Sequence, residues 1–223
     1  MRRWEREWRR DIHCQRKIKN ALAFLFINYQ LSTINYQLKK MAFINLENDL
    51  PGIRGPMAYS PETGKALNEL AEILLHDDNN ALTRGEREMI GAYVSSENDC
   101  FFCQHVHGAM AQHYFQCDTK LIDQIKKDYR SAPISDKLKA LLTIAGSVQK
   151  GGKFVTKLQV ALAKSFGATD KEIHDTVLIA AAFCMFNRYV DGLNTWAPQD
   201  RQVYIDRAKM RAEDGYANIN LNK

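Results

Sequence analysis

Two helix-start signals constrain the fold of this chain more than any other feature. Thr83-Arg-Gly-Glu86 and Thr169-Asp-Lys-Glu172 both match the capping box, in which a threonine and a glutamate three residues later satisfy free N–H groups at a helix N-terminus. Small and apolar residues follow each box, and no useful stretch shows the alternation of a strand. The sequence therefore predicts an all-α bundle, and the repeated box suggests two related helical halves.

Further start and stop signals divide the chain after Met41 into helices. A turn at Asn98-Asp99 is expected to cap a helix that begins at Cys100 and ends near Phe115. Five other helices are expected: one that begins after Ser60-Pro61, one near Lys120–Tyr129, one after Ser135, one over Val155–Phe166 and one near Asp200–Glu213.

Residues 1–40 differ in character from the rest. They carry ten Lys or Arg and three Asp or Glu, a net charge of +7, so the other 183 residues carry −2. The pentapeptide INYQL occurs twice, at Ile27–Leu31 and Ile34–Leu38. A signal peptide and an amphipathic membrane anchor are alternatives, but we favour a translated upstream segment that is disordered or a non-native start. The functional domain is then 41–223.

Composition narrows the classes of function. Hydrophobic content of 45% and charged content of 26% are ordinary for a globular protein, and no apolar run reaches the roughly 20 residues that span a bilayer. The slightly acidic main part gives no reason to expect nucleic-acid binding. Five cysteines, an odd number, favour a reducing compartment, so we expect a cytoplasmic protein without membrane contact.

The stretch from Cys100 to His107 concentrates the reactive groups. On a helix, Cys100, Cys103 and His107 fall within about 60° of one another, on a single stripe that excludes His105 and His113. Thiols three residues apart can form a disulfide after a modest adjustment. The helix N-terminus favours a thiolate, and His107 can exchange its proton.

Glu88 is the expected partner of this stripe. If the helices before and after Asn98-Asp99 form an antiparallel hairpin, the distances of Glu88 and His107 from the turn differ by only about two residues. The two side chains are then offset by roughly 3 Å along the helix axis. Glu88 can then reach His107 or Cys103 and complete a Glu–His–Cys relay. Glu97 lies at the turn itself, where a solvated capping residue is a simpler interpretation than a member of the relay.

Other interpretations of the cysteines stay open. A structural zinc site could use Cys100, Cys103 and His107 with a fourth ligand, although ligands on one continuous helix do not converge tetrahedrally. The pair could also be small buried residues, as we expect for Cys117 and Cys184.

The run from Glu88 through Asn98-Asp99-Cys100-Phe-Phe-Cys103 to His107 resembles the alkylhydroperoxidase D core, within the carboxymuconolactone decarboxylase-like superfamily. The similarity covers about 41–212, includes the segment Phe186-Asn187-Arg188, and is greatest to the uncharacterised peroxidase-related branch. It implies an all-α homo-oligomer that reduces hydroperoxides without a cofactor or metal, using a dithiol or protein reductant.

The resemblance also implies roles for four residues. Cys103 would attack the peroxide, Cys100 would resolve the product as a disulfide, and Glu88 and His107 would relay protons. Phe102 departs from the pattern, because studied members carry a histidine there, so the relay is shortened in this chain. Decarboxylases of the superfamily lack the cysteine pair. A thiol–disulfide oxidoreductase and a non-enzymatic redox-sensing or metal-binding module remain alternatives.

Overall fold

The computed structural model describes residues 22, 24–31 and 42–217. Contacts divide the chain into two units, Met1–Met41 and Ala42–Lys223. In the first unit, residues 22 and 24–31 are helical and exposed; the remainder of the predicted extension, 1–40, lies outside the described residues.

The second unit is built from helices joined by short loops, and residues 42–217 contain no strand. The predicted all-α class is therefore confirmed. The α-helices of this unit are α2 (Arg54–Tyr59), α3 (Pro61–Ala71), α4 (Arg84–Glu97), α5 (Phe101–Phe115), α6 (Thr119–Asp128), α7 (Asp136–Lys150), α8 (Lys157–Ser165), α9 (Asp170–Gly192) and α10 (Arg201–Asp214), with a short π-helix η1 (Glu72–His76) and a short 3-10 helix η2 (Gly152–Phe154).

Local capping signals explain where these helices begin. Both predicted boxes are present: Glu86 N–H donates to Thr83 Oγ1 at 3.2 Å, and Glu172 N–H donates to Thr169 Oγ1 at 3.1 Å. One expectation was wrong. Asp99 does not cap α5, because its φ of 56° is left-handed, and Cys100 is itself the N-cap residue. The second cysteine therefore lies in the first turn of α5.

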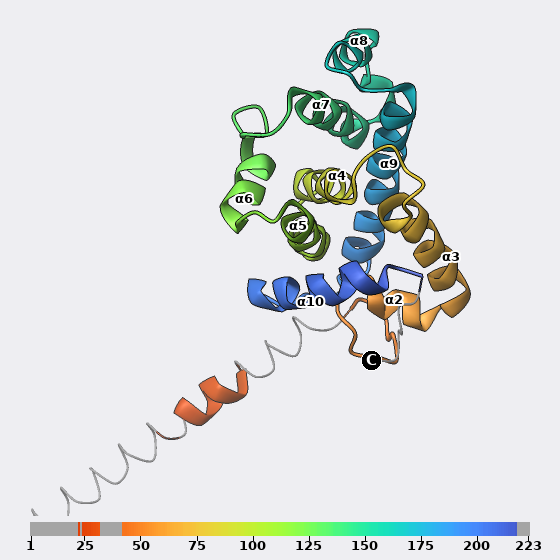
Figure 1. Ribbon diagram of the computed structural model, residues 1–223. Coiled ribbons are helices and arrows are strands. Elements are labelled where there is room, and N and C mark those ends of the chain that lie inside the picture. Colours follow the sequence, from red (N-terminus) through yellow and green to blue (C-terminus); the bar gives the residue numbers. More distant parts are fainter. Residues whose placement is uncertain (1–21, 23, 32–41, 218–223) are drawn as a thin grey trace, which may run out of the picture. The chain divides into compact units, whose positions relative to one another are not determined.

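Helix α4 is the centre of the main core. It packs against α5, α7 and α9, which surround it in Figure 1. Nearly every α4 side chain from Gly85 to Ser95 is buried. Close packing of α4 against α9 depends on Gly91, where a Cβ atom would meet Phe183 Cζ at 2.4 Å.

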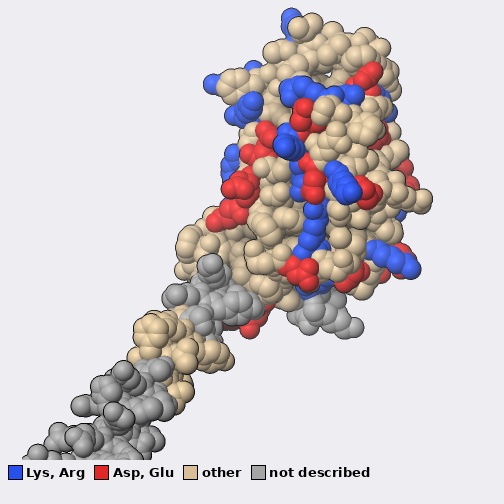
Figure 2. Space-filling view, turned by 90° about the vertical axis from the view of Figure 1, so that its left-hand side faces the viewer, with Lys and Arg blue, Asp and Glu red and all other residues tan. Residues whose placement is uncertain are grey.

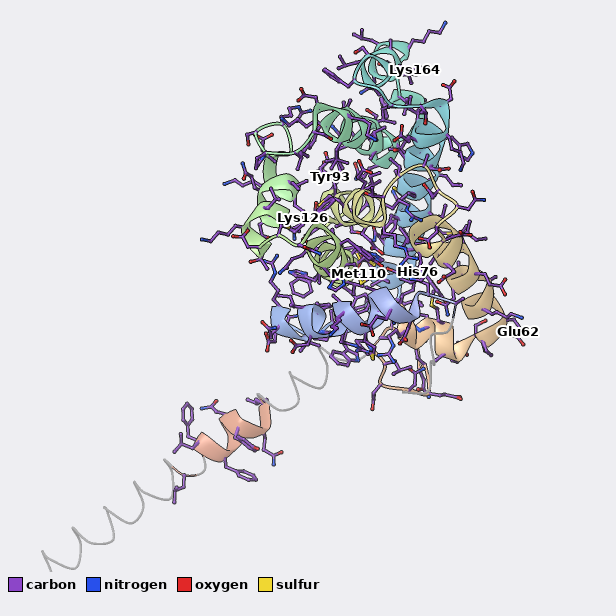
Figure 3. All side chains as sticks on the ribbon, viewed as in Figure 1. Glu62, His76, Tyr93, Met110, Lys126 and Lys164 are labelled. Carbon is purple, nitrogen blue, oxygen red and sulfur yellow. The ribbon has the colours of Figure 1, made fainter. Side chains whose placement is uncertain are left out.

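A second, smaller core lies between α5 and α10. Met110 of α5 points toward α10 in Figure 3 and is 1% exposed. The same core contains both cysteines of the pair together with Tyr204 and Ala208 of α10. The thiols therefore lie between α5 and the last helix, and not on an open surface.

The segment after α10 returns to the beginning of the domain. Glu72 in η1 accepts hydrogen bonds from the backbone N–H groups of Tyr216 and Ala217. His76 lies 2.6 Å from the same carboxylate and 3.2 Å from the Ala212 carbonyl. These contacts fix the position of the Tyr216 side chain.

The surface carries charges of both signs. On the face in Figure 2, Lys and Arg side chains alternate with Asp and Glu, and neither sign forms a continuous field. Within the described ranges, none of the helices combines the length and apolar character needed to cross a bilayer.

Candidate functional site

The cysteine pair is reduced and buried. Cys100 is 0% exposed and Cys103 is 3% exposed, and both are free thiols. Cys103 lines a cavity of about 110 Å³, whereas Cys100 is not among the residues that form its wall. A small molecule in this cavity would therefore meet the sulfur of Cys103 first.

His107 lines the same cavity as Cys103. Its Nδ1 atom lies 2.7 Å from Glu88 Oε2, so the register predicted for the α4–α5 hairpin is present. The histidine side chain is 12% exposed and the carboxylate is fully buried. Since a carboxylate can only accept, a neutral His107 holds its proton on Nδ1 and leaves the Nε2 lone pair for the cavity.

Aromatic rings hold His107 in this orientation. Phe183 contacts it edge-on, with ring centroids 4.5 Å apart, and Tyr216 stacks on it at 6.1 Å. Within the described part of the chain, no hydrogen bond joins His107 directly to either thiol. Proton transfer between Cys103 and His107 therefore requires a water or substrate oxygen between them.

Tyr216 completes the group around Glu88. Its hydroxyl donates to Glu88 Oε1 at 2.7 Å and lies 3.5 Å from His107 Nδ1. Burial, followed by the nearby Glu88 charge, raises the pKa of Tyr216 well above its usual value. The hydroxyl thus stays protonated and acts as a permanent donor to the carboxylate. Nothing in the sequence indicated Tyr216, which lies 128 residues from Glu88.

Two polar residues of α9, Asn187 and Asp191, form hydrogen bonds with the thiols of Cys103 and Cys100, respectively. Asn187 is 1% exposed, donates to Ser95 Oγ at 3.0 Å and accepts from Asn98 Nδ2 at 2.8 Å. Burial raises the pKa of Asp191, and a hydrogen bond with Cys100 opposes this shift. The sequence drew attention to Asn187 only through the Phe186-Asn187-Arg188 resemblance, and it gave no signal for Asp191.

The Cys103 thiol is less acidic than its position at a helix N-terminus suggested. Hydrogen bonding with Cys100, together with burial, holds the pKa of the Cys103 thiol well above its usual value, and a hydrogen bond from Asn187 only partly opposes this. Cys103 is therefore a neutral thiol near pH 7 and needs a base when it reacts.

Two other histidines and two other cysteines of the described residues lie apart from this arrangement. His105 Nδ1 donates to the Phe101 carbonyl at 2.7 Å, and His113 is exposed. Cys117 and Cys184 are partly buried against the main core. The described residues hold no group of three or more His, Cys, Asp or Glu side chains placed to bind one metal ion.

The helical fold and buried cysteine pair define an all-α protein with one thiol of the pair, Cys103, at the wall of an apolar cavity. The chain belongs to the carboxymuconolactone decarboxylase family, whose model matches residues 61–114 and 120–197. This agrees with the resemblance noted in the sequence.

Two solved structures are similar. One is the alkylhydroperoxidase AhpD core of an uncharacterized peroxidase-related protein from Ralstonia eutropha JMP134, 28% identical, with a TM-score of 0.63 over 70% of this chain and 80% of that chain. The other is an uncharacterized peroxidase-related protein from Silicibacter sp. TM1040, 25% identical, with a TM-score of 0.62 over 70% of this chain and 78% of that chain. A search of curated proteins finds none that matches.

Proposed function

We propose that the protein is a thiol-dependent hydroperoxidase that reduces hydrogen peroxide or organic hydroperoxides. One observation carries the proposal: Cys103 and His107 line one cavity, while Cys100 lies behind Cys103 and Glu88 lies behind His107. The family and the peroxidase-related neighbours support the same class of chemistry.

The first half-reaction oxidises Cys103. His107 Nε2 takes the thiol proton through the peroxide oxygen that lies between them, and the thiolate attacks the other peroxide oxygen. The O–O bond breaks, an S–O bond forms, and the departing alkoxide receives a proton from His107. The products are an alcohol and a Cys103 sulfenic acid. Glu88 and Tyr216 stabilise the imidazolium that forms during the step.

The second half-reaction closes the disulfide. The Cys100 sulfur attacks the Cys103 sulfur, an S–S bond forms, and the sulfenic oxygen leaves as water after it takes the Cys100 proton. Asp191, hydrogen-bonded to Cys100, is placed to assist this deprotonation. A dithiol reductant then returns two electrons and two protons, and we propose that it reaches Cys103 through the cavity.

Burial of both thiols favours this function over reduction of protein disulfides. Thiols that are 0% and 3% exposed cannot meet a disulfide on the surface of a folded protein without opening of the helices around them. A small peroxide needs only the cavity.

The test is a peroxidase assay of the wild type beside Cys103→Ser and Cys100→Ser, with Cys117→Ser as the matched control. We expect loss of turnover in both pair variants and none in the control. In Cys100→Ser, one equivalent of peroxide should leave a Cys103 sulfenic acid that a dimedone probe labels. Sulfenic acid on Cys100 in Cys103→Ser, with none on Cys103, would reverse the roles, and full turnover without Cys103 would refute the proposal.

A further inference from the structure

The cavity beside Cys103 combines an apolar wall with a group of positive charges. Arg54 of α2 and both Arg207 and Arg211 of α10 line it, among apolar side chains such as Met57 and Phe186. Arg207 and Arg211 are four residues apart, so they lie one turn apart on the same face of α10. Arg207 is exposed and Arg54 is buried.

The three guanidinium groups are close enough to influence one another. Burial lowers the pKa of Arg54 most, and the charges of Arg207 and Arg211 lower it further. Burial likewise lowers the pKa of Arg211, and Arg207 adds to this effect. Like charges beside an apolar space are unfavourable until an anion lies between them.

Arg207 and Arg211 of α10 lack carboxylate partners at ion-pair distance among the described residues. Within 42–217, no ion pair joins Arg207 or Arg211 to an acidic side chain. Arg211 donates to the Gly215 carbonyl at 3.0 Å and lies 5.6 Å from the centroid of the Tyr216 ring. The charges of Asp214 and Glu88 act on Arg211. Asp214 is exposed, and both oxygens of Glu88 are occupied by His107 and Tyr216.

We infer that the cavity binds an organic hydroperoxide that carries a carboxylate, with the carboxylate at Arg207 and Arg211 and the peroxide at Cys103. This inference rests on the proposed function. Arginine binds carboxylates through two parallel, charge-assisted hydrogen bonds, and an exposed Arg207 lets the anion keep part of its hydration. The alkyl portion lies against the apolar wall.

The size of the cavity limits the apolar portion of the substrate. An apolar cavity of about 150 Å³ holds one benzene molecule, so a cavity of about 110 Å³ holds a short alkyl chain. The carboxylate takes no part in the chemistry: the O–O bond breaks as described above, and the product is the corresponding hydroxy acid. The arginines thus select the substrate and do not react with it.

The experiment compares three probes of similar length: 6-hydroperoxyhexanoate, its methyl ester and hexyl hydroperoxide. Oxidation of the pre-reduced protein is followed in a single turnover, which separates the peroxide step from the reductant. We expect the carboxylate to react about tenfold faster or more than the ester at low salt, and the ratio to fall as ionic strength rises.

Variants of α10 assign this preference to residues. Arg207→Gln and Arg211→Gln should bring the carboxylate-to-ester ratio close to one. Lys209→Gln removes the same charge from the same helix at an exposed position outside the cavity wall, and it should keep the ratio of the wild type. Arg207 is exposed, so its variant tests the idea even if Arg211→Gln folds poorly. An unchanged ratio in Arg207→Gln overturns the inference.

A binding measurement separates this inference from the proposed function. Octanoate, but not octan-1-ol, should slow alkylation of Cys103 by iodoacetamide, and Arg207→Gln should abolish the protection. If octanoate protects while no hydroperoxide reacts, the hydroperoxidase proposal fails and the carboxylate site stands. Equal rates for all three hydroperoxides, without protection by octanoate, overturn the carboxylate site and leave the hydroperoxidase intact.

Discussion

Glu88 and His107 face each other across the α4–α5 hairpin, with 2.7 Å between Oε2 and Nδ1. The carboxylate is fully buried, so this contact and the Tyr216 hydroxyl satisfy a charge that would be costly if left unpaired. The arrangement keeps the proton on Nδ1 and leaves Nε2 available at the cavity.

Removal of the Tyr216 hydroxyl tests its part in this arrangement. In Tyr216→Phe, Glu88 Oε1 loses its donor at 2.7 Å, so the free energy of unfolding should fall by about 1–3 kcal/mol. The peroxide step should also slow, by less than in His107→Ala, because Nδ1 keeps its carboxylate. Urea unfolding and single-turnover oxidation measure the two effects. Tyr189→Phe, at a half-buried position of α9 outside the site, is the control; equal results for both variants would mean that Tyr216 has no special role.

Gly91 couples core packing to the site. A Cβ atom there would meet Phe183 Cζ at 2.4 Å, and Phe183 packs edge-on against His107. Gly91→Ala should therefore destabilise the fold by about 1–3 kcal/mol, despite the better helix propensity of alanine, and should slow the peroxide step. Gly192→Ala meets no atom within 4 Å and should leave both urea unfolding and the rate nearly unchanged. A stabilised Gly91→Ala protein would show that Phe183 moves freely.

Glu72 makes the attachment of the C-terminal segment sensitive to acid. Partial burial raises the pKa of Glu72, but hydrogen bonds from the Tyr216 and Ala217 N–H groups and from His76 outweigh it, so the pKa lies below its ordinary 4.5. A depressed carboxyl pKa stabilises the fold above the unfolded value, and this stabilisation is lost as pH falls through the folded value. Amide protection of Tyr216 and Ala217 should therefore fall as pH drops below about 4.5.

Hydrogen exchange, expressed as protection factors, measures this attachment. Glu72→Gln should lower the protection already at neutral pH and remove its dependence on acid. Glu69→Gln alters an exposed acid that lies 3.9 Å from Lys65, and it should behave like the wild type. The same pH dependence in Glu72→Gln and the wild type would contradict the assignment.

The fold was predictable because its signals are local. The boxes at Thr83 and Thr169 act within one helical turn. Helix α2 gave no such signal, because it is only six residues long and has no side-chain cap. Cys100 caps α5 in place of the expected Asp99, because Asp99 adopts a left-handed backbone conformation that the sequence pattern did not reveal.

The geometry of the candidate site was predictable only where one helix or one hairpin determines it. Cys100, Cys103 and His107 follow from helical periodicity, and Glu88 follows from the register of α4 and α5. Tyr216 is brought to Glu88 by the return of the chain after α10, which no periodicity encodes. The raised pKa of Cys103 arises from the nearby thiol and from burial. The position at the helix N-terminus, taken alone, predicted a pKa shift in the wrong direction.

The proposed proton relay gives the last prediction. Because the pKa of Cys103 is raised well above its usual value, its thiolate is scarce near pH 7 and the proposed peroxide step should depend on a base. His107→Ala should slow single-turnover oxidation at pH 7 by about 10²–10⁴-fold, and the defect should shrink as rising pH forms the thiolate without help. Glu88→Gln should give a smaller defect, and the double variant should be far from additive, because the two groups act as a unit.

His105→Ala is the matched control for this relay, because His105 lies on the same helix and bonds to the Phe101 carbonyl. Its rate and its pH profile should follow those of the wild type. The pH dependence of Cys103 alkylation by iodoacetamide, measured without peroxide, separates the thiol from the later proton transfers. If the alkylation and oxidation profiles of wild type, His107→Ala and Glu88→Gln superimpose, His107 and Glu88 only support the fold around Cys103, and another group must accept the thiol proton.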